Sequence, residues 1–222
     1  MDTIVSIQAR LGSTRLPGKV LLPIGDYRIL EWVVQRALWA DTEDMDFMVA
    51  IGDNPENKAI EELCCRRSYE YMVGPEDNLL KRHLQVARSG DYDTLIRLTA
   101  DCPFVPSAEI TRTYSHHDAS DAVYTRNDWP SDADYVMPTG TAVDVFDVEL
   151  LERLAAEGAM HPNRRPLESP DKYGVEFAPN KEWGQYGDAH MAVDTPADYW
   201  RLVDAFEAVQ KAPSDVAEWL SQ

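Results

Sequence analysis

Three cationic side chains stand close together near the start of the chain. Arg10, Arg15 and Lys19 lie in one short stretch with the glycines Gly12 and Gly18. Cations are scarce elsewhere, because the sequence has 21 Lys and Arg against 39 Asp and Glu. Cationic side chains and glycine-freed backbone N–H groups are the partners that bound phosphates require. The stretch therefore predicts a nucleotide-phosphate site, with a solvated surface turn as the alternative.

The segments on either side of this loop predict how it is held. The apolar run Ile4–Ile7 predicts a buried strand, and the apolar pattern from Ile29 to Trp39 predicts a helix. A loop from a strand end to a helix is a common phosphate site in α/β proteins. The loop does not have the Gly-x-x-x-x-Gly-Lys-Ser/Thr pattern of a P-loop.

Strand and helix patterns alternate along the rest of the chain. We expect further strands at 47–51, 69–73, 94–98, 122–124, 141–146, 175–177 and 190–193, and helices at 55–66, 79–88, 107–115, 148–157 and 196–209. A last helix in 211–222 is expected with Ser214 as its cap, and the proline-containing segment 160–172 predicts an irregular loop. This order predicts an α/β fold with a mostly parallel mixed sheet, helices on both faces, and a single domain over 1–222.

Two aspartates, Asp101 and Asp194, each follow a predicted strand. Carboxylates at the carboxyl ends of parallel strands point into the crevice where ligands bind, and Mg²⁺ takes one or two carboxylates together with phosphate oxygens. Each aspartate has a structural alternative, because Asp101 precedes the turn at Pro103 and Asp194 precedes a helix that starts at Pro196. The residues alone leave both interpretations open.

Composition excludes several classes of protein. The net charge of −18 argues against nucleic-acid binding, and an acidic surface with little lysine resembles that of proteins from salt-loving organisms. No apolar run approaches the roughly 20 residues of a membrane span, and the first strand starts too early for a secretory signal, so we expect a cytoplasmic protein. Cys64, Cys65 and Cys102 match no zinc site and are expected to be reduced thiols.

The segment from Ala9 to Lys19, Ala-Arg-Leu-Gly-Ser-Thr-Arg-Leu-Pro-Gly-Lys, resembles the signature of the cytidylyltransferases that make CMP-activated acidic sugars. These are the CMP-ketodeoxyoctonate and CMP-acylneuraminate synthetases. With Gln8 before it and Val20-Leu21 after it, the segment is most similar to the spore-coat polysaccharide biosynthesis protein F branch. The resemblance implies a Rossmann-like (GT-A-like) nucleotidyltransferase that uses CTP and Mg²⁺ and releases pyrophosphate. It also implies a homodimer, for which residues 126–138 are a candidate arm.

The resemblance also assigns roles to residues. It implies that Arg15, Lys19 and Asp101 are catalytic and that Asp101 and Asp194 bind the metal. The segment around Asp101 resembles the family's Thr-Gly-Asp-x-Pro motif, and the segment around Asp194 resembles its Val-Asp-Thr-Pro motif. The implied nucleotide contacts are Ala9, Arg10, Leu11, Gly12, Ser13, Arg15, Lys19, Thr99 and Ala100, and the candidate acceptor contacts are Arg82, Asp144, Arg164 and Arg165. Asp144 stands where the family carries glutamate, and the segment 160–166 departs from the family's pattern. Paired guanidinium groups in that segment suit a carboxylate or a phosphate.

Two other functions remain compatible with the sequence. One is a nucleotidylyltransferase that uses UTP, GTP or dTTP on a sugar phosphate. The other is a non-catalytic nucleotide-binding or assembly protein on the same scaffold. The presence of both candidate metal aspartates favours an enzyme.

Overall fold

The computed structural model describes residues 2–40, 45–128, 136–209 and 213–220. Within these residues, seven strands form one sheet in the order β5-β4-β1-β6-β8-β7-β9. The strands are β1 (Thr3–Ala9), β4 (Met45–Gly52), β5 (Tyr71–Gly74), β6 (Thr94–Thr99), β7 (Tyr124–Arg126), β8 (Asp144–Asp147) and β9 (Val175–Phe177). Strand β8 runs antiparallel to both of its neighbours, whereas every other pair in this sheet is parallel. The predicted mostly parallel mixed sheet is confirmed.

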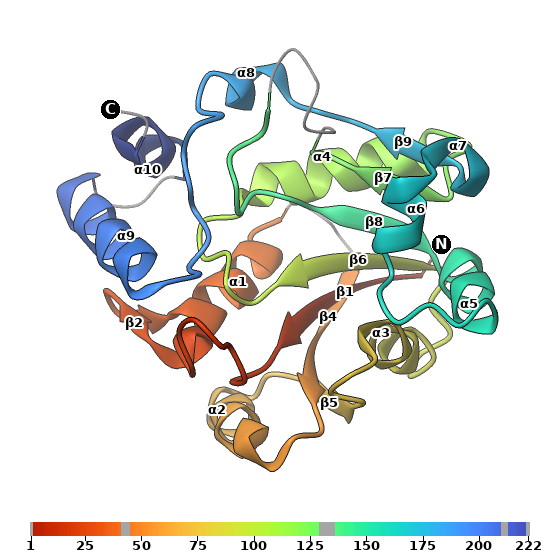
Figure 1. Cartoon of the computed structure of the whole chain (residues 1–222), viewed down its shortest axis with the longest axis horizontal. Helices are drawn as coiled ribbons and strands as arrows, with labels where there is room; N and C mark the ends of the chain where they lie inside the picture. The colour runs from red at the N-terminus through yellow and green to blue at the C-terminus, as the bar shows by residue number, and fades with distance from the viewer. Residues whose placement is uncertain (1, 41–44, 129–135, 210–212, 221–222) are drawn as a thin grey trace.

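Successive side chains of a strand point to opposite faces of the sheet, and both faces are covered (Figure 1). On β1, Ile4 joins one buried cluster with α3 and α5, while Val5 and Ile7 join another with α1, α2 and α4. The helices are α1 (Ile29–Leu38), α2 (Lys58–Arg67), α3 (Leu79–Ala87), α4 (Ser107–Asp118), α5 (Val148–Ala156), α6 (Arg164–Glu168), α7 (Pro170–Tyr173), α8 (Lys181–Gly184), α9 (Pro196–Val209) and α10 (Pro213–Leu220), with 3₁₀ turns η1 (Lys19–Leu21) and η2 (Pro55–Asn57). Helices therefore lie on both faces, as predicted.

A third apolar cluster attaches the end of the chain to its beginning. The small hairpin of β2 (Pro23–Ile24) and β3 (Tyr27–Arg28) packs with α9 and α10 around residues such as Phe104 and Met191. Figure 1 shows these two helices on the side of the sheet toward which β1 and β6 point. This packing brings the segment before α9 to the carboxyl ends of the central strands.

Some predicted elements were wrong. Residues 190–193 form no strand of the sheet: His190 makes an isolated bridge to Thr139, and the N–H of Val193 donates to the carbonyl of Asp101 at 2.9 Å. The segment 160–172 holds α6 and α7 instead of an irregular loop. Its prolines are compatible with helix, because Pro166 lies in the first turn of α6 and Pro170 begins α7.

Element boundaries moved by a few residues elsewhere. Strand β8 starts at Asp144 instead of residue 141, because the N–H of Val143 bonds to the side chain of Asn127. Strand β7 begins two residues later than predicted, and α10 begins at Pro213, one residue before Ser214. Residues 129–135 of the candidate dimerisation arm lie outside the described residues, so the arm and the single domain over 1–222 stay predictions. In the described part of the chain, no helix has the length and apolarity that crossing a membrane requires.

Candidate active site

The loop between β1 and η1 is folded around the carbonyl group of Leu11. That carbonyl accepts hydrogen bonds from the N–H of Ser13 at 2.7 Å and from the N–H of Gly18 at 3.0 Å. Gly18 has a φ of 73°, in the left-handed region that suits glycine. The N–H of Leu11 donates to Asn57, and its side chain packs against the core. Leu11 therefore shapes the loop, and it does not line the cavity beside it.

Lys19 follows this loop, and its ammonium group is surrounded by three oxygen acceptors. Its Nζ donates to the carbonyl of Val193 at 2.5 Å and lies 2.6 Å from Oδ2 of Asp101 and 3.1 Å from Oδ1 of Asp194. The residue is 8% exposed. Burial by itself would lower the pKa of Lys19, but the charges and hydrogen bonds of Asp101 and Asp194 outweigh burial and raise it. Lys19 is therefore a buried cation between two carboxylates.

Backbone contacts bring the two aspartates together although they are far apart in the sequence. Ala100, just after β6, donates its N–H to the carbonyl of Gln8 in β1, which fixes where Asp101 emerges. Val193 bonds to the carbonyl of Asp101, so that Asp194 lies beside it. Arg15 reaches the same place, with Nη2 at 2.8 Å from Oδ1 of Asp194, and its side chain is 62% exposed. The predicted metal aspartates and two of the predicted cations therefore meet at one point.

The carboxylate of Asp194 does not cap α9. Asp198 accepts hydrogen bonds from the N–H of Asp194 at 3.1 Å and from the N–H of Thr195 at 2.7 Å, and Oγ1 of Thr195 accepts from the N–H of Asp198 at 3.3 Å. Thr195 and Asp198 thus cap the helix reciprocally. The capping role considered for Asp194 is therefore taken by Thr195 and Asp198, and the carboxylate of Asp194 faces the cavity.

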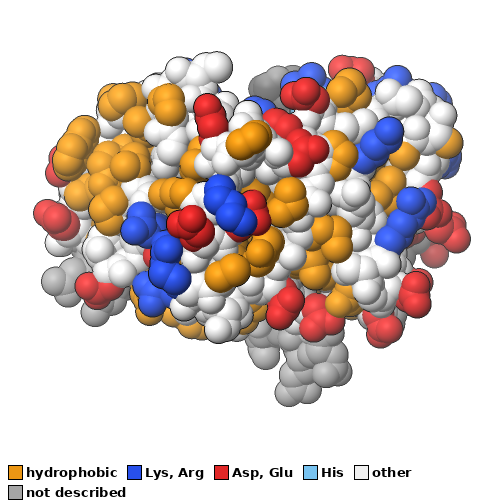
Figure 2. Space-filling model, turned by 90° about the horizontal axis from the view of Figure 1, so that it is seen from below, with side chains coloured by type: hydrophobic (Ala, Val, Ile, Leu, Met, Phe, Trp, Pro, Cys, Tyr) orange, Lys and Arg blue, Asp and Glu red, His pale blue; other side chains and the backbone are white. Residues whose placement is uncertain are grey.

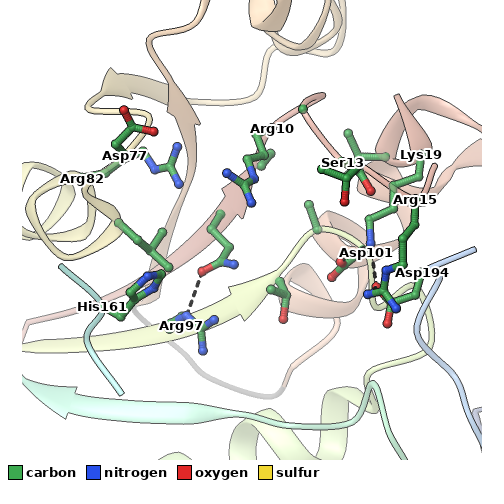
Figure 3. Close-up of a pocket in the computed structure, with 18 of the residues that line it drawn as sticks. Arg10, Ser13, Arg15, Lys19, Asp77, Arg82, Arg97, Asp101, His161 and Asp194 are labelled. Carbon is green, nitrogen blue, oxygen red and sulfur yellow. Dashed lines mark hydrogen bonds and ion pairs between the residues drawn. The ribbon is translucent and has the colours of Figure 1, made fainter. Parts of the chain in front are cut away.

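A cavity of about 450 Å³ opens beside this group (Figure 3). Figure 3 shows Lys19, Arg15, Asp101 and Asp194 at one end, with the second end on the far side of Arg10. The lining residues are Gln8, Ala9, Arg10, Gly12, Ser13, Thr14, Arg15, Lys19, Val20, Asp77, Leu79, Arg82, Arg97, Thr99, Ala100, Asp101, His161, Asn163, Arg164 and Asp194. All the predicted nucleotide contacts except Leu11 line this cavity.

The second end of the cavity is cationic. Arg82, on α3, is 3% exposed, and its Nε and Nη1 have no hydrogen-bond partner among the described residues. Arg97 of β6 and Arg164 at the start of α6 line the same end. Burial lowers the pKa of His161, and Arg164 and Arg97 lower it further, so the imidazole is neutral near pH 7. An anionic group would find several guanidinium partners here.

Asp144 and Arg165, two of the predicted acceptor contacts, do not line the cavity. Asp144 is 1% exposed and accepts hydrogen bonds from Tyr124 Oη at 2.6 Å and from Arg126 Nη1 at 2.7 Å. It also pairs with Arg97, which positions that guanidinium group. Burial would raise the pKa of Asp144, but Arg126 and Arg97 lower it below its ordinary value. Arg165 donates instead to the carbonyl of Glu157 at 2.9 Å.

Sequence reasoning missed Gln8, Arg97, His161 and Asn163 as cavity residues. Arg97 carried a usable signal, because an arginine inside an otherwise apolar strand must either be paired or face a ligand. Here it is paired, with Nε donating to Oε1 of Gln8 at 2.8 Å. His161 and Asn163 carried no such signal, because segment 160–166, which departs from the family's pattern, has no hydrophobic periodicity.

Comparisons with known proteins identify the family of this chain. A family model described as Cytidylyltransferase matches residues 4–167. The chain belongs to the cytidylyltransferase family. It is 29% identical over 218 residues to spore coat polysaccharide biosynthesis protein SpsF of Bacillus subtilis, covering 96% of this chain and 89% of that protein. It is 31% identical over 172 residues to 3-deoxy-manno-octulosonate cytidylyltransferase of Xanthomonas euvesicatoria, covering 75% of this chain and 62% of that one.

Solved cytidylyltransferases have the same fold. A cytidylyltransferase from Leptospira borgpetersenii superposes with a TM-score of 0.87 at 24% identity, covering 99% of this chain and 93% of that one. The structure of CMP:2-keto-3-deoxy-manno-octonic acid synthetase complexed with CTP gives a TM-score of 0.68 at 16% identity, covering 94% and 99%. The predicted nucleotidyltransferase fold is therefore confirmed, and the chain is an enzyme of the nucleotidyltransferase class.

The residues of this cytidylyltransferase site suit a magnesium ion that arrives with a nucleotide. Asp101 and Asp194 both approach one cation, the Lys19 ammonium, so their carboxylates are close enough to share a metal. In the described part of the chain, no cluster of three or more His, Cys, Asp or Glu side chains could hold a metal. Mg²⁺ is usually bound by one or two carboxylates when phosphate oxygens and water complete its coordination.

Proposed function

We propose that this enzyme transfers CMP from CTP to an acidic acceptor, releases pyrophosphate, and depends on Mg²⁺. The meeting of Lys19, Asp101 and Asp194 at one end of a cavity carries the proposal. The family and the CTP complex of a structural neighbour support CTP as the donor. The names of the relatives support a role in making surface polysaccharide or a related glycoconjugate.

The acceptor oxygen would attack the α-phosphorus of CTP in line with the departing pyrophosphate. The protein would act by positioning the substrates and by neutralising charge. Arg15 has an exposed guanidinium that forms a single ion pair among the described residues, so it can turn toward the β- and γ-phosphates at small cost. Arg10, Gly12 and Ser13 would line the nucleotide. When bound, Mg²⁺ would be held by Asp101 and Asp194 and would polarise the phosphoryl group as a Lewis acid.

The cationic end of the cavity supports an acceptor that carries an acid group. Arg82 and Arg164 would bind its carboxylate or phosphate, and Arg97 would contribute from its fixed position on Asp144. Arg82 has the strongest case, because two of its buried nitrogens, Nε and Nη1, have no hydrogen-bond partner among the described residues, and an anionic ligand would supply one. A sugar acid and a small phosphorylated molecule both fit this chemistry.

The proposal also includes a cytoplasmic location and a homodimer. Light scattering would measure the mass of the dimer.

Pyrophosphate release tests the reaction. We would measure it in high potassium chloride with Mg²⁺, using the four NTPs and a panel of acidic sugars and phosphorylated small molecules. Release with CTP and one acceptor supports the proposal and names the acceptor. Release with another NTP would move the enzyme to a different nucleotidyltransferase. Folded protein that binds CTP but releases no pyrophosphate would favour a non-catalytic role.

Asp101→Asn tests the assigned site within that assay. The amide keeps the shape of the side chain but loses the charge, so we expect turnover to fall by about a hundredfold or more with the melting temperature nearly unchanged. Asp147→Asn is the matched control, because Asp147 lies at the end of a strand of the same sheet but contacts His117 and does not line the cavity. Full turnover in the Asp101 variant would remove the metal assignment.

A further inference from the structure

Asn57 makes three hydrogen bonds to three different segments, although it does not line the cavity. It is 1% exposed at the end of η2. Its Oδ1 accepts from the N–H of Leu11 at 2.7 Å, and its Nδ2 donates to the carbonyl of Gly52 and to Oε2 of Glu76, both at 2.8 Å. Both amide hydrogens are used, and the donor at Oδ1 and the acceptors at Nδ2 define the orientation of the amide.

The bond to Leu11 controls the nucleotide loop. The carbonyl of Leu11 already accepts from Ser13 and Gly18, so Leu11 connects the first turn of the loop to its last residues. Lys19 follows directly. Fixing the amide of Leu11 therefore fixes the frame that carries the phosphate-binding residues.

The bond to Glu76 controls the opposite wall. Oε1 of Glu76 lies 3.5 Å from Nη1 of Arg10, and the N–H of Glu76 donates to Oδ1 of Asp53 at 2.9 Å. Two residues further along, Asn78 caps α3 by accepting from the N–H of Lys81 at 2.9 Å, and α3 carries Arg82. Glu76 thus stands at the entry to the helix that supplies the cationic end of the cavity.

Gly52 leaves the space in which these side chains meet. A Cβ on Gly52 would lie 1.7 Å from Oε2 of Glu76 and 2.7 Å from Nη1 of Arg82. The end of β4 is therefore packed directly against Glu76 and Arg82. Asn57 ties that strand end, the nucleotide loop and the entry to α3 into one unit.

We infer that Asn57 is a positioning residue that sets the spacing between the nucleotide loop and the acceptor-side wall. This inference rests on the proposed function, because a transfer between two substrates requires the two halves of a cavity at a fixed separation. A displacement of about 1 Å can cost about a hundredfold in rate. Glu76 is the partner through which Asn57 acts on the wall.

The test compares two asparagines of the same turn. Asn57→Ala removes the three bonds, whereas Asn54→Ala removes a cap on the N–H of Glu56 and leaves the loop and the wall untouched. For Asn57→Ala we expect kcat/KM for CTP to fall by about tenfold to a hundredfold. We also expect faster hydrogen exchange in the nucleotide-free protein over residues 10–19, measured by mass spectrometry. For Asn54→Ala we expect both quantities within about twofold of the wild type, although the melting temperature falls.

A swapped pair keeps the inference testable if Asn57→Ala fails to fold. Asn57→Asp retains the acceptor for Leu11 but sets a carboxylate against Glu76, so we expect loss of kcat/KM and faster exchange of the loop. Adding Glu76→Gln restores the hydrogen bond between residues 57 and 76 with donor and acceptor exchanged, whereas the bond to the carbonyl of Gly52 stays lost in both variants. We expect the double variant to recover at least about fivefold of kcat/KM relative to Asn57→Asp alone.

Three results would overturn the inference: unchanged kcat/KM and loop exchange in Asn57→Ala, equal losses in Asn54→Ala, or no recovery in the double variant. The exchange measurement needs no nucleotide. If the wild type turns over no substrate, the proposed function fails, and loop exchange alone then decides whether Asn57 positions the loop.

Discussion

The ammonium group of Lys19 has three hydrogens and three oxygen neighbours, on Val193, Asp101 and Asp194. To bind a nucleotide phosphate, as the sequence predicts, Lys19 must give up at least one of these contacts. The ammonium also screens the two carboxylates from each other and from any other cation. In the nucleotide-free protein, Lys19 therefore competes with a divalent metal for Asp101 and Asp194.

Lys19→Gln should increase the affinity of the nucleotide-free protein for a divalent cation. Charges about 4 Å apart interact by about 1–4 kcal/mol near a protein surface, so we expect Mn²⁺ to bind at least about tenfold more tightly. Calorimetric titration with Mn²⁺ would measure the change. Lys58→Gln is the control, because Lys58 pairs with Glu61 on an exposed surface away from the cavity. Equal Mn²⁺ affinity in the wild type and the Lys19 variant would contradict the competition.

His83 makes stability depend on pH. It is fully buried, and its Nδ1 lies 2.7 Å from Oγ of Ser6. Burial lowers the pKa of His83 well below its ordinary value, and the charges of Arg97 and Arg82 lower it further, while Asp144 has a weaker opposite effect. The unfolded chain, with a His pKa of about 6.5, then binds a proton that the folded protein does not, so stability is full above that pH and falls below it. At pH 5.5 the loss from this group is at most about 1.4 kcal/mol.

Urea unfolding at pH 7.5 and pH 5.5 would measure this effect in the wild type and in His83→Gln. We expect the free energy of unfolding to fall more in the wild type than in the variant, by up to about 1.4 kcal/mol. An equal fall in both proteins would show that His83 is not the group responsible.

At the scale of elements, the sequence predicts best where a segment makes its own hydrogen bonds. The β1 strand is present where its apolar run predicts it, and the side chains of Asn54 and Asn78 cap the turns that directly follow them. The segment 190–193 has the composition of a strand, but its backbone pairs with Thr139 and Asp101, which no local pattern encodes. Tertiary partners decided its conformation.

Gly140 shows how closely that segment is packed. Its φ is 95°, and a Cβ there would lie 2.6 Å from the backbone nitrogen of Ala192 and 2.7 Å from the carbonyl carbon of Met191. Gly140→Ala should therefore push the backbone that carries Asp194. We expect turnover to fall by about tenfold or more, together with about 1–3 kcal/mol of stability.

Gly158→Ala is a matched control for Gly140→Ala. Gly158 also has a positive φ, 77°, but nothing lies within 4 Å of a Cβ at that position. Gly158→Ala should lose a similar amount of stability through backbone strain while keeping full turnover per folded molecule. Equal loss of turnover in both variants would show that strain alone, without displacement of Asp194, explains the effect.

At the scale of the molecule, the site combines parts that the sequence could and could not supply. Arg10, Arg15 and Lys19 could be singled out because they share the loop after a recognisable strand, and Asp101 because it follows another strand. The cationic end of the cavity could not be predicted as a unit, because it depends on the sheet order that places β6 between β1 and β8. The burial of Asp144 could not be predicted for the same reason, because its partners Tyr124, Arg126 and Arg97 come from neighbouring strands.

The acidic surface predicts that salt stabilises this protein. The net charge is −18, and acidic side chains are spread over the face in Figure 2 instead of forming one patch, so folding brings many like charges closer together. Raising ionic strength from 0.01 M to 0.1 M shortens the screening length from about 30 Å to about 10 Å, and 1 M shortens it to about 3 Å. We expect the melting temperature at pH 7.5 to rise by about 5 °C or more between 0.02 M and 0.5 M potassium chloride. Sucrose at matched osmolality is the control, because it strengthens burial without screening charge. A melting temperature that stays flat in potassium chloride, or that rises equally in sucrose, would contradict repulsion as the cause and with it the expectation of a high-salt protein.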